Sequence, residues 1–149
     1  ITRAYNLPSR YVLHTVGPMV RREVTEQDRA LLRSCYNSCL DLAAEAGLRS
    51  VAFCCISTGV FSFPQAEAAE IATGAVLRWK MRHPENDMQI IFNPFLDSDP
   101  EIYRKILALV VVLEACLQSA ALPKGRPSCY SHNLCEKVAR RASEKFLEA

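Results

Sequence analysis

The 149-residue sequence has few glycines, no excess of charge of one sign and no long apolar run. Its 5 glycines, at positions 17, 47, 59, 74 and 125, lie far apart, so the chain contains no glycine-rich loop. Its 18 basic and 16 acidic residues give no broad electrostatic signal for nucleic acid. No apolar run reaches the roughly 18 residues that a membrane helix needs, and residues 1–10 lack the apolar core of a signal peptide. These absences argue against a membrane protein and against general nucleic-acid binding.

None of the 7 cysteines occurs in a CxxC spacing, which argues against the common zinc motifs. An odd number of cysteines cannot pair completely, and Cys54 and Cys55 lie inside an apolar run, so buried thiols in a reducing compartment are the simplest interpretation. Cys35 and Cys39 fall on the apolar stripe of a predicted helix and are interpreted as core residues rather than metal ligands. We expect no metal site built from this chain and a cytoplasmic or nuclear location.

Half of the residues are hydrophobic, and the chain is long enough for one domain with a real core. Segments with strand character and segments with helix character alternate along it. Strands are predicted at residues 10–16, 51–56 and 88–92, and helices at residues 26–46, 65–82, 100–121 and 134–147. This alternation predicts an α/β layered fold with parallel strand pairing.

Local signals mark the ends of the first two elements. The first strand is expected to stop at Gly17, which Pro18 follows. Thr25 is expected to cap the following helix, because Asp28 three residues later gives a weaker form of the capping box. Gly47 is well placed to end that helix.

The most informative stretch is residues 51–64, with the sequence VAFCCISTGVFSFP. The apolar run at residues 51–56 has the length of a strand that is buried on both faces. A small polar turn with one glycine follows, and the next helix is expected to begin at about Gln65. A strand, a glycine-containing loop and a helix N-terminus together present backbone N–H groups to an anion such as phosphate.

Side chains of the same loop suggest a ligand larger than phosphate alone. The hydroxyl groups of Ser57, Thr58 and Ser62 would add hydrogen-bond donors, and the rings of Phe61 and Phe63 would wall in a sugar or a base. The alternative interpretation is a buried strand followed by an ordinary turn into a helix, because a single glycine is a weak phosphate signature.

Ligands of parallel α/β sheets bind beyond the carboxyl ends of the strands. The loops after Val16, Ile56 and Phe92 meet that condition. The second of them is the stretch described above, and the third carries Asn93 and Phe95. The sequence therefore predicts that these loops form one ligand site.

Three segments resemble successive parts of a macrodomain, the ADP-ribose-binding module. They are LPSRYVLHTVGP at residues 7–18, CISTGVFSFPQAEAAEIA at 55–72 and FLDSDPEIYRKIL at 95–107. The similarity is greatest to the hydrolase-like branch and its zinc-containing microbial relatives. It implies a layered α/β/α fold with a mixed, mostly parallel sheet. It also implies a partial macrodomain over residues 1–109 and a C-terminal helical extension over residues 110–149.

The resemblance implies that the chain binds ADP-ribose or an ADP-ribosylated protein. Phe61 would pack against the distal ribose, Phe95 would stack near the adenine, and Asn93 would lie close to the adenosine side. A core position at the strand end is the other interpretation of Phe95. The loop that holds the diphosphate, mostly through backbone amides, would consist of Ser57, Thr58, Gly59, Val60, Phe61, Ser62 and Phe63.

The sequence departs from the family pattern at two places. Glycine is usual in the family where this chain has Ser62, and a serine there costs energy if its native φ is positive. The family's Asn- and Gly-rich loop, which in hydrolases carries the catalytic groups, is not found here, so the fold is expected to be incomplete on its N-terminal side. Catalytic residues stay unknown, and zinc is expected only in a full-length family member. Apolar surface left open by absent strands would favour self-association.

Two functions follow from the resemblance. The first is removal of ADP-ribose from modified proteins by a protein ADP-ribosylhydrolase. The second is a non-catalytic ADP-ribose reader, or a degenerate macrodomain that acts through protein interaction.

Overall fold

The structure is a computed structural model that describes residues 1–95 and 99–120. The helix predicted at residues 134–147 lies outside the described residues. The chain divides into two units, residues 1–99 and residues 100–149, and each is described by itself. The elements in chain order are β1 (Thr2–Arg3), β2 (Tyr11–Val12), α1 (Glu26–Glu45), β3 (Ser50–Phe53), α2 (Gln65–Arg82), β4 (Gln89–Phe92) and α3 (Asp99–Ala120).

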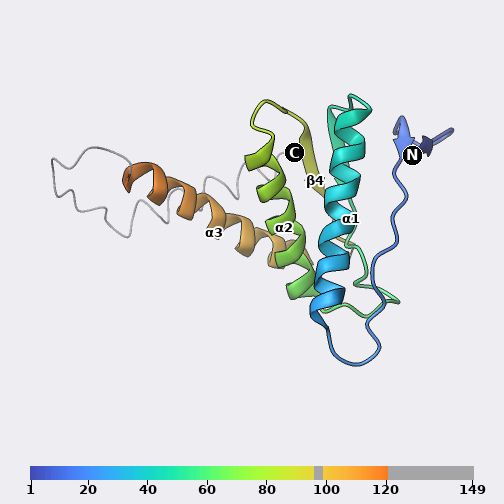
Figure 1. The fold of residues 1–149 in the computed structure, drawn as a ribbon, viewed down its shortest axis with the longest axis horizontal. Helices are drawn as coiled ribbons and strands as arrows, with labels where there is room; N and C mark the ends of the chain where they lie inside the picture. Colours follow the sequence, from blue (N-terminus) through green and yellow to red (C-terminus); the bar gives the residue numbers. More distant parts are fainter. Residues whose placement is uncertain (96–98, 121–149) are drawn as a thin grey trace. The chain divides into compact units, whose positions relative to one another are not determined.

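The strands and helices confirm the predicted α/β alternation of the first unit (Figure 1). β3 and β4 pair in parallel, with Val51 opposite Ile90 and Phe53 opposite Phe92, as the alternation with α2 between them predicts. α3, which belongs to the second unit, continues through residue 109. The boundary drawn there between a partial macrodomain and a helical extension stays a prediction.

The N-terminal segment differs from its prediction. The strand expected at residues 10–16 is reduced to β2, which pairs in antiparallel fashion with β1, a strand that the sequence did not reveal. Beyond β2 the chain continues without helix or strand beside α1 (Figure 1), where the Cys35 thiol donates a hydrogen bond to the Val16 carbonyl oxygen at 3.4 Å. This contact with a helix takes the place of strand pairing.

The sheet formed by β3 and β4 is buried on one face. Val51 and Phe53 are buried, whereas Ala52 between them is exposed. The expectation that this strand is buried on both faces is therefore wrong. On the buried side of β3, the Tyr36 ring of α1 lies 5.0 Å from the Phe53 ring, centroid to centroid.

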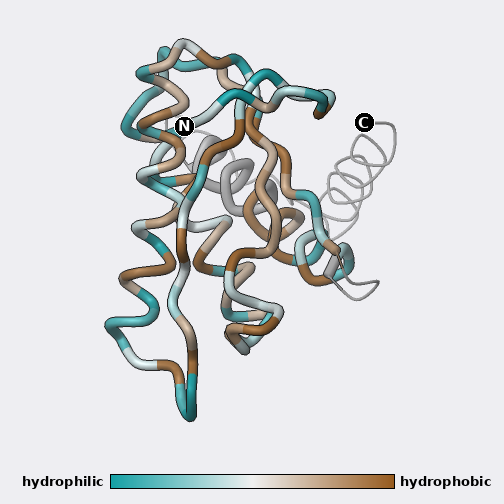
Figure 2. Tube along the Cα trace, turned by 90° about the vertical axis from the view of Figure 1, so that its right-hand side faces the viewer, coloured by the Kyte–Doolittle hydropathy of each residue, from teal (hydrophilic) through white to brown (hydrophobic). Residues whose placement is uncertain are grey.

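The core lies between α1, α2 and the covered face of the sheet. Hydrophobic and hydrophilic residues alternate in each turn of α1, the helix on the left of Figure 2, so that one stripe faces inward. The Trp79 indole N–H of α2 donates to a carboxylate oxygen of Asp41 on α1, at 2.7 Å, which satisfies the one polar atom of this buried ring. The largest fully buried side chains are Trp79, Tyr36, Phe63, Leu32, Leu40 and Thr73.

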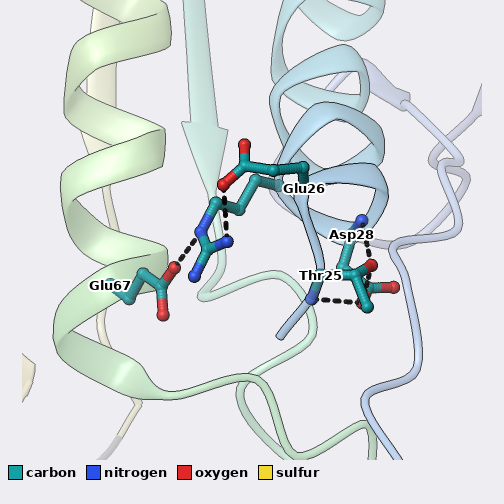
Figure 3. A network of polar contacts seen from close by, with 5 residues as sticks. Thr25, Glu26, Asp28 and Glu67 are labelled. Carbon is teal, nitrogen blue, oxygen red and sulfur yellow. Dashed lines mark hydrogen bonds and ion pairs between the residues drawn. The ribbon is translucent and has the colours of Figure 1, made fainter. Parts of the chain in front are cut away.

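Two groups of polar contacts lie at the N-termini of α1 and α2 (Figure 3). Arg29 of α1 pairs with Glu26 on its own helix and with Glu67 at the first turn of α2. The predicted capping box of α1 is confirmed, since the Asp28 amide donates to the Thr25 hydroxyl oxygen at 3.1 Å and the Thr25 amide donates to the Asp28 carboxylate at 2.9 Å. Gly47 has a φ of 64°, the left-handed conformation that ends a helix.

Replacing Thr25 by alanine is expected to lower the free energy of unfolding by about 1 kcal/mol. The Asp28 amide would lose its acceptor, the Thr25 hydroxyl oxygen, and the Asp28 carboxylate that accepts from the Thr25 amide would lose its hydrogen bond from that hydroxyl. The Thr25 hydroxyl, which donates to the carboxylate, lowers the pKa of Asp28. Because the pKa of Asp28 is lower in the folded protein than in the unfolded chain, its carboxylate stabilises the fold above about pH 4, the usual aspartate pKa. This stabilisation is lost as the pH falls through the folded-state pKa. Urea unfolding should therefore show the full wild-type advantage at pH 7 and a smaller one at pH 3. An equal advantage at both pH values would contradict the capping assignment.

Among the described helices, none is long and apolar enough to cross a membrane.

Candidate functional site

Three loops meet where β3 and β4 end. The amide of Asn93, which follows β4, donates to the carbonyl oxygen of Phe53 at the end of β3, at 2.8 Å. The chain that follows Val16 reaches the same place, since the Val20 amide donates to the Phe61 carbonyl oxygen at 2.9 Å. The prediction that these three loops converge at the carboxyl edge is confirmed.

The loop after β3 is held by its own hydrogen bonds. The Phe63 amide donates to the Ser57 carbonyl oxygen at 2.9 Å and closes the loop at its base. Within it the Ser62 amide donates to the Gly59 carbonyl oxygen at 2.9 Å. The Thr58 hydroxyl donates to the Cys55 carbonyl oxygen at 3.0 Å, and its role toward a ligand stays a prediction. The loop is therefore stabilised by hydrogen bonds among its own residues and with the end of β3.

The tip of this loop presents unpaired backbone N–H groups. Among the described residues, the amides of Gly59, Val60 and Phe61 donate to no protein acceptor. Gly59 is exposed and Val60 is 93% exposed, so the tip faces solvent. α2 begins at Gln65, and its N-cap residue, Pro64, offers no side-chain hydrogen bond to the first turn. Unpaired amides beside an uncapped helix N-terminus favour an anion, because both present partial positive charge.

Two serines of the loop adopt the left-handed backbone conformation. Ser62 has a φ of 56°, which confirms the positive φ that the family's glycine suggested, and Ser57 has a φ of 68°. Gly59 does not have a positive φ, and a Cβ added to it would meet no atom within 4 Å. Neither the backbone conformation nor a close neighbour therefore requires glycine at position 59.

Ser62→Gly is expected to raise the free energy of unfolding by about 0.5–1 kcal/mol. A non-glycine residue in the left-handed region costs roughly 1–2 kcal/mol, which glycine avoids. The greater conformational entropy of glycine in the unfolded chain offsets part of this stabilisation. Thermal unfolding of the variant and the wild type checks this. A lower melting temperature for Ser62→Gly would show that the hydroxyl, not the backbone strain, decides stability here.

The sequence did not reveal how closely Gly17 approaches the loop. A Cβ at Gly17 would lie 2.1 Å from the Ser57 hydroxyl oxygen and 2.7 Å from a methyl group of Ile56, distances that no real side chain tolerates. The Ser57 hydroxyl is buried by this contact and has no hydrogen-bond partner. Gly17 was predicted only to end a strand, whereas it also lets the first loop pack on the second. A glycine beside a predicted strand end was the one available signal.

The aromatic candidates separate into a core residue and exposed residues. Phe63 is only 2% exposed, so the expectation that its ring walls in a sugar is wrong and only its backbone can contribute. Phe61 is half-buried. Phe95 is 89% exposed and Asn93 is exposed, which excludes the core interpretation of Phe95 and leaves its ring available for stacking.

The cysteines near the site differ in burial: Cys54 is exposed and Cys55 is half-buried, so the expectation that these two thiols are buried is wrong. Cys35 and Cys39 are buried, as the helical stripe predicted, and burial raises the pKa of the Cys39 thiol. Within the described part of the chain, no three His, Cys, Asp or Glu side chains lie together in a way that could hold a metal ion. The zinc expected of a full-length family member thus has no ligand set among these residues.

A parallel strand pair with an amide-lined loop before a helix N-terminus is an arrangement typical of phosphate-binding α/β domains. Residues 1–72 match the family model of the Macro domain. A protein-ADP-ribose hydrolase of Treponema medium is 52% identical over 108 residues, which are 72% of this chain and 41% of that protein. A protein-ADP-ribose hydrolase of Staphylococcus aureus (strain MSSA476) is 50% identical over 106 residues, 70% of this chain and 40% of that protein. Residues 1–72 of this chain are therefore similar to the macrodomain family.

Solved macrodomains share the fold. The Oceanobacillus iheyensis macrodomain with ADP gives a TM-score of 0.66 at 34% identity, over 74% of this chain and 56% of that one. The Trypanosoma brucei macrodomain in complex with ADP-ribose gives a TM-score of 0.64 at 40% identity, over 71% of this chain and 43% of that one. The chain thus spans about two fifths of the length of the curated relatives it matches.

Proposed function

We propose that this chain binds the ADP-ribose group, free or attached to a protein, through the loop at residues 57–63. The observation that carries the proposal is the set of three unpaired amides, of Gly59, Val60 and Phe61, beside the N-terminus of α2. A diphosphate has enough oxygen acceptors for all three, and the dipole of the helix favours its charge. The Oceanobacillus iheyensis macrodomain with ADP and the Trypanosoma brucei macrodomain with ADP-ribose each have a ligand that contains a diphosphate.

The adenosine end of the ligand is assigned to the loop after β4. The exposed ring of Phe95 supplies a face for the adenine, and Asn93 lies beside the diphosphate loop because its amide is bound to the end of β3. Stacking of a base on a large exposed aromatic ring makes the free energy of binding more favourable. The half-buried Phe61 is assigned to the distal ribose.

Hydrolysis of protein-linked ADP-ribose is the activity that we propose for the whole protein, because both curated relatives described above carry the name of that activity. A reader that binds ADP-ribose without chemistry is the second candidate, and the same loop would serve it equally well. A cytoplasmic location and self-association stay predictions.

The loop assignment is tested by recording the amide resonances of the ¹⁵N-labelled 149-residue chain during titration. ADP-ribose and inorganic pyrophosphate are expected to shift the amides of Gly59, Val60 and Phe61, whereas adenosine is expected to shift the Phe95 region instead. If pyrophosphate leaves these three amides unmoved while ADP-ribose binds elsewhere, the diphosphate assignment is wrong.

Phe95→Ala is expected to weaken ADP-ribose binding about tenfold, because stacking of a base on an aromatic ring contributes roughly 1–3 kcal/mol. Binding of ribose 5-phosphate, which has no base, should change less than twofold. Fluorescence competition with both ligands measures the two effects in parallel. Equal losses for the two ligands would show that Phe95 supports the loop rather than the adenine.

A further inference from the structure

A second concave surface lies between α1 and α2, far from the diphosphate loop. This groove has a volume of about 420 Å³ and is lined by Asn37 of α1 and by Arg78, Met81 and Arg82 of α2. Arg78 follows the first residue of α2, Gln65, by 13 positions, which corresponds to about 20 Å along the helix axis. The groove is therefore distinct from the site at the N-terminal end of α2.

The groove carries uncompensated positive charge. In the described part of the chain, ion pairs involve Arg29, Arg104 and Lys105 but neither Arg78 nor Arg82. The guanidinium of Arg78 lies back over Gly74, 3.3 Å from where a Cβ would be, so the missing side chain lets it lie close to the helix. The Arg82 Nε donates to the Arg78 carbonyl oxygen at 3.3 Å, but neither guanidinium group has an ion-pair partner among the described residues. Two such groups one turn apart suit a carboxylate.

The groove also has an apolar side. The Met81 side chain is 80% exposed and lies between the two arginines in the sequence. Methionine adapts its shape to apolar partners, and the aliphatic stems of the arginines extend that surface. A ligand with an apolar residue next to its acidic residues would match both properties.

We propose that this groove binds an acidic polypeptide segment of a partner protein, with carboxylates on Arg78 and Arg82 and an apolar residue on Met81. The occupant is argued from charge complementarity and from the exposed apolar surface of Met81 beside the two arginines. The proposal is independent of ADP-ribose binding, because it uses none of the residues at the diphosphate loop.

The test uses fluorescence anisotropy with a labelled peptide of repeated Glu-Glu-Leu units and the 149-residue chain. The double variant Arg78→Gln/Arg82→Gln is expected to bind this peptide at least about tenfold more weakly than the wild type, as the loss of two charge-assisted contacts implies. Arg49→Gln, which removes an exposed arginine outside the groove, is the matched control and should change binding less than twofold. Circular dichroism and ADP-ribose affinity should be unchanged in the double variant.

Several outcomes would overturn the proposal. Failure of the wild type to bind the peptide would do so, as would equal losses for Arg49→Gln and the double variant, which would show a general charge effect. Inorganic phosphate that displaces the peptide at equal concentration would identify a simple anion site. A peptide in which glutamine replaces every glutamate should not bind, and if it binds equally well the assigned carboxylate contacts are wrong.

Discussion

Gly59→Val is expected to weaken ADP-ribose binding at least about 100-fold, which corresponds to about 2.7 kcal/mol of binding free energy. Gly59 lies at the exposed tip of the loop where the diphosphate is proposed to bind, so a branched side chain there is expected to compete with the ligand for space. The fold should tolerate the change, because a Cβ there meets no atom within 4 Å and the backbone is not in the left-handed region. Calorimetric titration measures the affinity, and thermal unfolding confirms that the variant is folded.

A second glycine provides the control for Gly59→Val. Gly74 lies in the middle of α2, and a Cβ there would meet only the flexible end of Arg78. Gly74→Ala should leave ADP-ribose affinity unchanged and raise stability by about 0.5–1 kcal/mol, the usual gain of alanine over glycine inside a helix. An unchanged affinity in a folded Gly59→Val variant would contradict the assignment of the loop to the diphosphate.

Gly17→Ala is expected to lower the free energy of unfolding by about 2 kcal/mol and to weaken ADP-ribose binding at least about tenfold. The new methyl group would overlap the Ser57 hydroxyl and a methyl group of Ile56, and overpacking of this kind costs typically 1–3 kcal/mol. Relief of the overlap requires the first loop to move away from the diphosphate loop. Urea unfolding and calorimetry measure the two effects on the same sample.

A second substitution separates the effect of the Gly17–Ser57 contact from a general loss of stability. Ser57 already has a positive φ, so Ser57→Gly should fit the backbone and remove the overlapping hydroxyl, whose buried oxygen has no hydrogen-bond partner. Gly17→Ala in the Ser57→Gly background should therefore cost less than in the wild type, with the overlap on Ile56 remaining. Additive losses would show that the two residues do not contact each other.

Local signals in the sequence located the helices well. Thr25 and Asp28 gave the start of α1, and Gly47 gave its end, because capping depends on residues within one turn of each other. α2 was predicted with its observed bounds from its apolar side and the loop before it. The strands were predicted less well. β1 consists of two residues, and its pairing with Tyr11 and Val12 is a contact between distant segments that no local pattern encodes.

The candidate site was predictable where it depends on chain order. Parallel strands end at one edge, so the meeting of the loops that carry Gly59 and Asn93 followed from the predicted topology. The burial of Phe63, the internal hydrogen bond of the Thr58 hydroxyl and the close approach of Gly17 depend on packing in three dimensions. These features could not be inferred from residue types and spacing. The positive φ of Ser62 is an intermediate case, because it followed from the resemblance to a family that has glycine there.

Calorimetric titration of the 149-residue chain with ADP-ribose, with AMP as the matched ligand, tests the central claim most directly. AMP keeps the adenosine and one phosphate but lacks the second phosphate and the distal ribose, which are assigned to the loop at residues 57–63. The account predicts saturable binding of ADP-ribose at one site, at least about tenfold tighter than binding of AMP, or about 1.4 kcal/mol. A folded chain that binds neither ligand, or that binds both equally, would contradict it.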